Sequence, residues 1–330
     1  MELRQLRAFV AVAAEGHFGR AAARLNLTQP GLTLRIQALE KEIGAHLLER
    51  NAREVHLTAA GTALLPYAKS LLRIEDRALL ELKDQAEGIA GRLRIGYLSS
   101  GAVAFPGRVV AEFRRRYPTV QVDTSSDYSG VNAERLREGM LDVAFLHPGF
   151  VGFRGAAADG IAVRLLSRDN IVLALNPNHE LATLEHVPVK ALRRKPLVIF
   201  VSSPYKAFIV ELERFLAAQL GEEPNVVGHE PPDLALQEVI RSTSLITFAN
   251  GARATSIPVP GIAYRRLSPE PLIDFGVAYF RDDESASLAN FLRLVEELAP
   301  DQPGELPNDS VLLAAQDPLP DADYATAARR

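Results

Sequence analysis

The stretch Phe18-Gly19-Arg20-Ala21-Ala22-Ala23-Arg24-Leu25-Asn26-Leu27-Thr28-Gln29-Pro30 decides the fold of the first part of this 330-residue chain. Its three successive alanines predict a short helix that a second helix can approach closely. Thr28 is a good N-cap, and Pro30 stands in the first turn of the next helix, where a missing N–H costs nothing. The stretch therefore predicts two helices joined by a tight turn.

The residues on either side complete a small domain. A first helix, ended by Gly16, is predicted by apolar residues at helical intervals: Leu3, Leu6, Phe9, Val10 and Ala13. The third helix runs to about Ile43 before Gly44, and its inward face is predicted to hold Leu32, Ile36, Leu39 and Ile43. Residues 47–50 and 54–57 predict two short strands around a turn. This is the layout of a winged helix-turn-helix, whose second helix enters the DNA major groove. Spacing alone leaves open a three-helix interaction module.

Charge is unevenly distributed along the chain. The net charge is −4, which by itself argues against a partner with a phosphate backbone. Residues 1–60 hold eight basic and six acidic residues, a net +2, whereas residues 301–330 hold two basic and six acidic residues, a net −4. The local charge of the first domain is therefore compatible with DNA, and the acidic end accounts for the overall sign.

Composition excludes several classes of site. The chain has no cysteine, so disulfides and thiolate metal sites are impossible. Its seven histidines are scattered, and we find no nucleophile–base pair or glycine-rich phosphate loop. We therefore expect no enzyme activity, cofactor or metal. No apolar run is long enough for a bilayer and the N-terminus does not read as a secretory signal, so we expect a cytoplasmic protein.

The first sixty residues resemble the LysR-type transcriptional regulators. The resemblance rests on the opening stretch and on its continuation through residues 36–40, 43–44, 47–50 and 57–61. It implies sequence-specific binding to double-stranded promoter DNA, with RNA polymerase as a candidate further partner. The family's base-reading positions correspond to Thr28, Gln29, Pro30, Thr33, Leu34 and Arg35. Leu34 and Arg35 depart from the usual residues there, which bears on the DNA sequence that is read.

Two arginines on the predicted wing complete the expected DNA contacts. Arg50 ends the first short strand and Arg53 lies in the turn between the two strands, from which both can reach phosphates or the minor groove. We therefore take residues 1–58 as the DNA-binding domain.

Residues 59–90 predict a long linker helix. Its apolar residues form a three-four seam interrupted by Glu75: Leu65, Ala68, Leu72, Leu79, Leu82, Ala86 and Ile89. We expect this seam to pair with a second copy of the chain, and the alternative is packing within the same chain. The family resemblance also implies homodimers, and tetramers made from pairs of dimers.

Residues 91–299 alternate between strand and helix patterns. They predict parallel sheets with helices on both faces, arranged as two α/β lobes: lobe I at about 91–161 and 264–299, and lobe II at about 162–263. A looser resemblance to the family continues here. It implies a periplasmic-binding-protein-like effector domain with a cleft between its lobes. The acidic, proline-containing residues 300–330 are expected to be disordered.

Candidate effector contacts follow from their places at strand ends, where ligands bind in such sheets. They are Ser99, Ser100, Gly101, Asp127, Ser129, His147, Ser202, Ser203 and Phe248. Hydroxyls and backbone N–H groups at strand–helix junctions suit an anion, so we expect a small organic anion such as a carboxylate metabolite. An enzyme or solute receptor with the same two-lobed fold would leave residues 1–60 unexplained, and a purely structural DNA-binding protein would leave the cleft unexplained.

Overall fold

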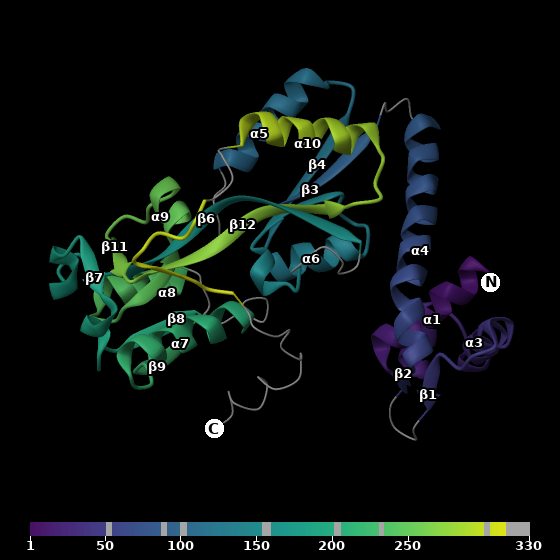
Figure 1. Ribbon diagram of the computed structural model, residues 1–330, viewed down its shortest axis with the longest axis horizontal. Helices are drawn as coiled ribbons and strands as arrows, with labels where there is room; N and C mark the ends of the chain where they lie inside the picture. The colour runs from purple at the N-terminus through teal and green to yellow at the C-terminus, as the bar shows by residue number, and fades with distance from the viewer. Residues whose placement is uncertain are drawn as a thin grey trace. The chain divides into compact units, whose positions relative to one another are not determined.

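The computed structural model describes residues 1–50, 55–86, 91–99, 104–153, 160–200, 206–230, 234–299 and 304–314. The chain divides into two compact units, Met1–Ile89 and Ala90–Arg330, and each is considered by itself (Figure 1). Among the described residues, no helix has the length and apolar character needed to cross a membrane.

The first unit is the predicted winged helix-turn-helix. It contains α1 (Leu3–Glu15), α2 (Phe18–Arg24), α3 (Gln29–Ile43), β1 (Leu48–Arg50), β2 (Val55–Leu57) and α4 (Ala59–Ala86). The Thr28 hydroxyl accepts a hydrogen bond from the Gly31 N–H at 3.3 Å, as expected of an N-cap. Gly44 ends α3 with a φ of 78°, in the left-handed region. These local signals fix the ends of α3, and the fold of this unit is confirmed.

On the long helix α4, the residues of the predicted apolar seam are not all exposed. Ala68 is 0% exposed and Leu72 is 9% exposed, because both pack into the core of their own unit with Leu6 and Phe9 from α1. Among the described side chains of α4, the large exposed apolar residues are Tyr67, Leu71, Ile74, Leu79 and Leu82, of which only Leu79 and Leu82 belong to the predicted seam. The first half of the predicted seam therefore packs within its own chain, which was the alternative to pairing with a second copy.

The second unit is built on mixed sheets. One sheet has the order β4-β3-β5-β12-β6-β11-β7, with β10 beside β6 and β13 beside β12, and β8 pairs with β9 separately. The strands are β3 (Arg92–Leu98), β4 (Gln121–Asp127), β5 (Val143–Leu146), β6 (Ile161–Leu175), β7 (His186–Pro188), β8 (Leu197–Phe200), β9 (Val226–Glu230), β10 (Thr247–Asn250), β11 (Ala263–Ser268), β12 (Glu270–Phe280) and β13 (Ser310–Leu312). The helices are α5 (Ala104–Arg116), α6 (Ser129–Arg137), η1 (Pro148–Phe150), η2 (Glu180–Thr183), η3 (Val189–Leu192), α7 (Lys206–Leu220), α8 (Leu234–Ser242), α9 (Gly251–Ser256) and α10 (Ala286–Leu298).

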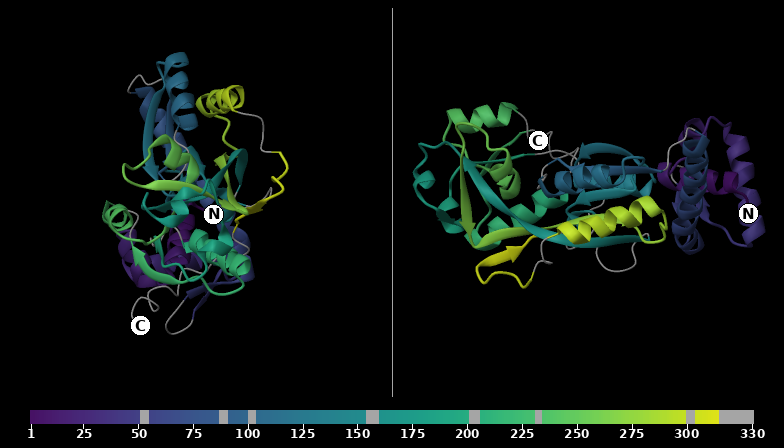
Figure 2. Two further views of the ribbon diagram at one scale, coloured as in Figure 1. Left: turned by 90° about the vertical axis from the view of Figure 1, so that its left-hand side faces the viewer. Right: turned by 90° about the horizontal axis from the view of Figure 1, so that it is seen from above.

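Two long antiparallel strands, β6 and β12, run through both lobes (Figures 1 and 2). The prediction of parallel sheets is correct for β3, β4 and β5, but wrong for β12, which is antiparallel to both β5 and β6. Only one end of each long strand has a continuous apolar pattern in the sequence: residues 171–175 of β6 and residues 276–280 of β12. The middle of β6, residues 167–170, is polar and interrupts the apolar pattern.

The two lobes have separate apolar cores. Leu166 and Phe275 belong to the core of lobe I, whereas Ile171 and Ile273 belong to that of lobe II. The lobes therefore meet near residues 167–170 of β6 and 274 of β12. The lobe boundaries predicted at residues 161 and 264 lie several residues before these points. The reason is that the chain passes from one lobe to the other in the middle of a continuous strand each time.

The expectation of a disordered C-terminal segment is wrong for residues 304–314. Within them, β13 pairs in parallel with β12 and is the yellow arrow in Figure 2. Leu313 is buried in the core of lobe II. Residues 300–303 and 315–330 lie outside the described residues. The strand was missed because Val311, Leu312 and Leu313 stand between prolines and acidic residues.

Candidate DNA-binding surface and effector pocket

The first two turns of α3 carry all six predicted base-reading residues on or near the surface. Gln29, Pro30 and Leu34 are exposed together with the capping Thr28, while Thr33 and Arg35 are half-buried. Leu34 is 65% exposed, an unusual state for leucine. The opposite face of α3 is fully buried through Leu32, Ile36 and Leu39. This arrangement leaves the exposed edge of α3 available to enter a groove of duplex DNA.

Glu40 connects the wing, formed by β1 and β2, to α3, and it was not among the predicted site residues. The buried carboxylate of Glu40 accepts hydrogen bonds from the N–H groups of Leu47 at 2.8 Å and Leu48 at 3.3 Å. Strands β1 and β2 then pair with Arg50 opposite Val55. The Arg50 side chain and the whole of Arg53 lie outside the described residues. The sequence held no sign that Glu40 points inward, since its neighbours Lys41 and Glu42 are exposed.

A cavity of about 560 Å³ opens between the lobes of the second unit. This volume lies within the roughly 300–1,000 Å³ typical of small-molecule sites. Four of the predicted contacts line it: Ser99, Ser129, His147 and Phe248. They come from the end of β3, the start of α6, the end of β5 and β10. The rule that strand ends converge on one cleft therefore brought these residues together correctly.

The other predicted contacts are not part of this cavity. Asp127 does not line it; its carboxylate forms an ion pair with Arg135 at 3.3 Å and accepts the Tyr128 N–H at 2.9 Å. The Asp127 carboxylate is therefore paired with a cation of α6 and does not face this cavity as a lining residue. Residues 100, 101, 202 and 203, namely Ser100, Gly101, Ser202 and Ser203, lie outside the described residues.

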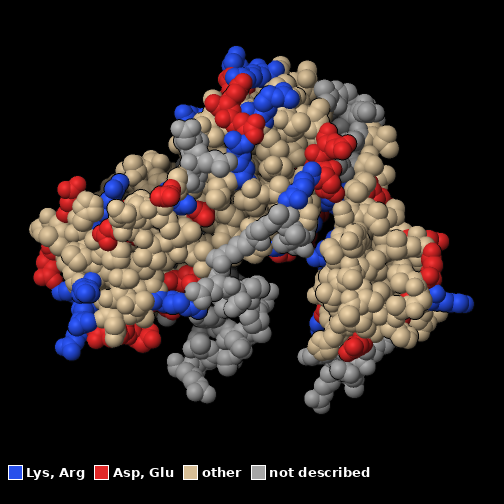
Figure 3. Space-filling model, viewed as in Figure 1, with Lys and Arg blue, Asp and Glu red and all other residues tan. Residues whose placement is uncertain are grey.

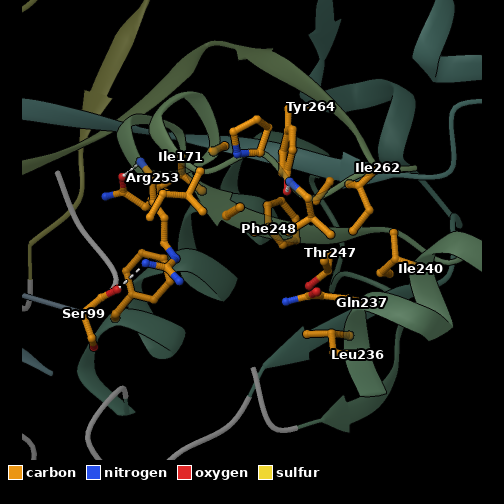
Figure 4. A pocket seen from close by; sticks show the side chains of 18 of the residues that line it. Ser99, Ile171, Leu236, Gln237, Ile240, Thr247, Phe248, Arg253, Ile262 and Tyr264 are labelled. Carbon is orange, nitrogen blue, oxygen red and sulfur yellow. Dashed lines mark hydrogen bonds between the residues drawn. The ribbon is translucent and has the colours of Figure 1, made fainter. Parts of the chain in front are cut away.

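One end of the cavity is polar (Figure 4). There the Arg253 guanidinium of α9 donates from Nη1 to the backbone carbonyl of Ser99 at 2.8 Å, which links lobe II to lobe I. Among the described residues, the buried Ser99 hydroxyl has no hydrogen-bond partner. Asn250 caps α9 by accepting the backbone N–H of Arg253 at 3.0 Å. This end therefore offers a cation and an unused hydroxyl.

The remainder of the cavity is mainly apolar. In Figure 4, Phe248 and Tyr264 lie between the Ser99–Arg253 end and the far end, where Leu236, Ile240 and Ile262 are found. Two polar groups also lie toward that far end, Gln237 and Thr247. Thr247 Oγ1 is buried and has no partner among the described residues. The site suits a molecule with one anionic group and a largely apolar body.

A buried carboxylate joins two lining residues of the cavity, one from each lobe. Asp169 of β6 is 3% exposed. Its Oδ2 lies 3.3 Å from Nε2 of His147 in lobe I and accepts a hydrogen bond from Asn250 in lobe II at 2.8 Å. A buried carboxylate needs such partners, because an unsatisfied charge in an apolar interior is costly. Asp169 thus connects residues from both lobes under the cavity.

Arg253, Asp169 and Thr247 were absent from the predicted contacts. Asn250 stood where a strand end meets a helix cap, which is a usable signal. Arg253 becomes available only because the short helix α9 turns its first residues toward β3. Nothing in the sequence near Asp169 marks it as buried.

Basic residues on the second unit are largely paired with acidic ones. Figure 3 shows blue and red groups intermixed over α5. There Glu112 forms ion pairs with Arg115 at 2.5 Å and Arg116 at 2.6 Å, and hydrogen bonds from these two arginines lower the pKa of Glu112 to about 2. Arg116 also pairs with Glu297 at 2.6 Å. This region of mixed charge lacks the uniform basic character of a nucleic-acid surface.

The chain matches two family models over most of its length. Residues 3–62 match the bacterial regulatory helix-turn-helix protein of the lysR family, and residues 86–300 match the LysR substrate binding domain. The transcriptional regulator AlsR of Bacillus subtilis is 29% identical over 295 residues, which is 89% of this chain and 95% of AlsR. The regulator IlvR of Caulobacter vibrioides is 30% identical over 305 residues, 90% of this chain and 98% of IlvR.

Solved structures agree with these matches. The crystal structure of CbnR, a LysR family transcriptional regulator, is 25% identical with a TM-score of 0.53, and the match covers 91% of this chain and all of CbnR. Full-length CbnR bound to its target DNA matches with a TM-score of 0.50. Full-length BenM is 26% identical with a TM-score of 0.51, covering 90% of this chain and 96% of BenM. These relatives are regulators rather than enzymes, and this chain belongs to the LysR family of DNA-binding transcriptional regulators with an effector-binding domain.

Proposed function

We propose that this regulator reads promoter DNA with the first two turns of α3 and responds to a small organic anion with an apolar body. The observation that carries the effector proposal is the polar end of the cavity. Arg253 and the Ser99 hydroxyl, which has no partner among the described residues, stand there together at the point where the lobes are joined. A carboxylate would satisfy both groups, since charge-assisted hydrogen bonds to guanidinium are among the strongest in proteins.

The rest of the lining supports the apolar body. Burial of a hydrophobic group against Phe248, Ile240 and Ile262 contributes roughly 25 cal/mol per Å² of apolar surface. A ligand that replaces the Arg253–Ser99 hydrogen bond would also change how the two lobes are held. Differential binding to two lobe arrangements is what allows a ligand to shift a conformational equilibrium.

For DNA, the proposed reading residues are Thr28, Gln29, Pro30, Thr33, Leu34 and Arg35, with Arg50 and Arg53 on phosphates or in the minor groove. Exposed Leu34 is suited to the methyl group of a thymine, which is the apolar feature of the major groove. We propose that Gln29 and Arg35 form hydrogen bonds to neighbouring base edges.

We further propose that two chains pair through the exposed apolar face of α4. Tyr67, Leu71, Ile74 and Leu82 follow one another at spacings of four, three and eight residues, which keeps them on one side of a helix. Pairing would present two DNA-binding units to two half-sites. Tetramers and a contact with RNA polymerase remain predictions from the family, as does a cytoplasmic location, where promoter DNA is found.

The experiment has two steps. Duplexes selected from a random library by the full chain would serve as DNA probes in gel-shift assays. Calorimetry would then test a panel of aromatic and aliphatic carboxylates against their uncharged amides. We expect binding of at least one carboxylate, no binding of its amide, and a changed DNA affinity when that carboxylate is present. Selection of no DNA sequence would contradict the proposed reading, and tighter binding of the amides would contradict the proposed anion.

A further inference from the structure

The strand β13 lies beyond the residues that match the family model, which end at residue 300. It pairs in parallel with β12, with Ser310 opposite Glu270 and Leu312 opposite Leu272. Strand β12 is one of the two strands that join the lobes. The last part of the described chain is therefore attached to the connection between them.

Hydrogen bonds hold this segment at both ends. At its start, the Asp309 carbonyl accepts the Glu270 N–H at 2.8 Å, and the Ser268 hydroxyl donates to the Asp309 carboxylate at 2.6 Å. At its end, the Leu313 N–H donates to the Leu272 carbonyl at 2.7 Å. These bonds fix the register of β13 against β12.

The register brings Leu313 beside Ile273. Leu313 is 5% exposed and shares the lobe II core with Ile273, while Phe150 and Val311 pack against the same core. Ile273 and Phe150 also line the effector cavity. Leu313 therefore lies in the same apolar cluster as two residues of the cavity wall.

That wall spans both lobes. The ring of Phe150, from η1 after β5, meets the ring of Phe208 from α7 edge to face at 5.6 Å, and both line the cavity. Nearby, a Cβ at Gly149 would come within 3.2 Å of the Ala314 side chain, so the end of the segment lies against η1. The register of β12 against β6 shifts between Phe275 and Gly276, just beyond the residues that β13 covers.

We propose that residues 304–314, called here the C-terminal strap, are a built-in part of the effector pocket. Leu313 is its positioning residue: it holds Ile273 and Phe150 in the cavity wall, while β13 adds a third strand where β6 and β12 cross between the lobes. The inference rests on the proposed function only in that it takes this cavity as the effector site.

The absence of tryptophan from the chain makes a local test available. Phe150→Trp would place a single fluorescent reporter in the cavity wall, and Tyr117→Trp would place a control reporter in lobe I. Each would be combined with Leu313→Asp, with Leu313→Ala and with the conservative Leu313→Met in the full chain. Acrylamide quenching of tryptophan fluorescence would report solvent access at each position.

We expect Leu313→Asp to raise the quenching constant at position 150 by about two-fold or more, because loss of the packing opens the wall locally. Leu313→Ala should have a smaller effect of the same sign, and Leu313→Met should restore the wild-type value. The Tyr117→Trp reporter should not respond. A chain shortened after residue 314 should resemble wild type, and one shortened after residue 303 should resemble Leu313→Asp.

Equal quenching at position 150 in all Leu313 variants would overturn the proposal. So would an equal rise at both reporters, which would mean general loosening rather than a local role. If aspartate prevents folding, the alanine variant and the two shortened chains make the same comparison. None of these measurements uses DNA or an effector, so failure of the strap and failure of the proposed function are distinguishable.

Discussion

At one end of the cavity, Arg253 of lobe II and Ser99 of lobe I are joined by a hydrogen bond of 2.8 Å from the guanidinium to a backbone carbonyl. The acceptor is uncharged, and among the described residues Arg253 has no ion pair. Its cationic side chain is therefore held in place at the cavity, and none of the described acidic residues neutralises it there. A cation in this state is ready to exchange a neutral acceptor for an anionic one.

Replacing Arg253 by glutamine should selectively weaken anion binding. Loss of a hydrogen bond to a charged group costs about 1.5–3 kcal/mol, so the affinity for the tightest carboxylate of the panel should fall about ten- to a hundredfold. Calorimetry would measure this loss. Arg241→Gln is the matched control, because Arg241 is paired with Glu238 at 2.8 Å and does not line the cavity. An equal loss in both variants would remove Arg253 from the effector site.

Leu34 should confer a preference for thymine. Replacing the contacted thymine by deoxyuridine removes one methyl group, which is worth about 0.8 kcal/mol when buried, and should weaken binding about four-fold. The Leu34→Ala variant should lose this discrimination, while Ala38→Ser, at an exposed position one turn later, should keep it. Gel shifts with substituted duplexes would measure both. Full discrimination in Leu34→Ala would show that another residue contacts the methyl.

Hydrogen-bonding residues on α3 should contribute more than Leu34. Gln29→Ala or Arg35→Ala should each weaken specific binding by about 1–3 kcal/mol if the side chain reads a base edge. The loss should be confined to specific duplexes, which a parallel titration with random-sequence DNA would check. A variant with unchanged affinity and unchanged selected sequence would exclude that residue from reading.

The sequence predicted those parts of the molecule that depend on local signals. The start and end of α3 could be located because Thr28 and Gly44 act on adjacent backbone groups. Ser99 and His147 could be assigned to a cleft because both stand at strand ends, and strand order alone brings them together. In such cases the outcome follows from the residue's own position at a helix end or a strand end.

Long-range pairing explains what could not be predicted. Leu313 becomes buried only because β13 pairs with β12, some forty positions earlier in the chain. Asp127 is not among the residues that line the cavity, and its carboxylate instead pairs with Arg135 on the next helix. The spacing of apolar residues on α4 also could not show which of two neighbouring leucines is buried. Leu71 is exposed and Leu72 is buried.

Opposite effects are therefore expected at the two faces of α4. Ile74→Glu, on the exposed face, should break chain pairing and leave the melting temperature of the monomeric protein unchanged. Leu72→Ala, on the buried face, should destabilise the first unit by about 2–5 kcal/mol, as is usual for truncation of core leucines. Sedimentation velocity and thermal unfolding would separate the two effects. A dimeric Ile74→Glu chain would rule out this face as the pairing surface.

The stability of the second unit should fall in mildly acidic solution because of His179. Its Nδ1 accepts the Leu181 N–H at 3.1 Å and so caps η2, which requires an unprotonated nitrogen. Burial lowers the pKa of His179 below its ordinary value of 6.5, although the nearby Glu180 carboxylate opposes this shift.

The unfolded chain therefore binds a proton at His179 more readily than the folded chain does. It follows that the free energy of unfolding should decrease as the pH falls below about 6.5, and should level off below the folded pKa. His179→Asn keeps a capping acceptor without the titration, so it should flatten this part of the profile, whereas His186→Asn, at an exposed position, should not. Denaturant unfolding between about pH 7.5 and about pH 5.5 would measure the slopes. An unaltered slope in His179→Asn would assign the acid sensitivity to other groups.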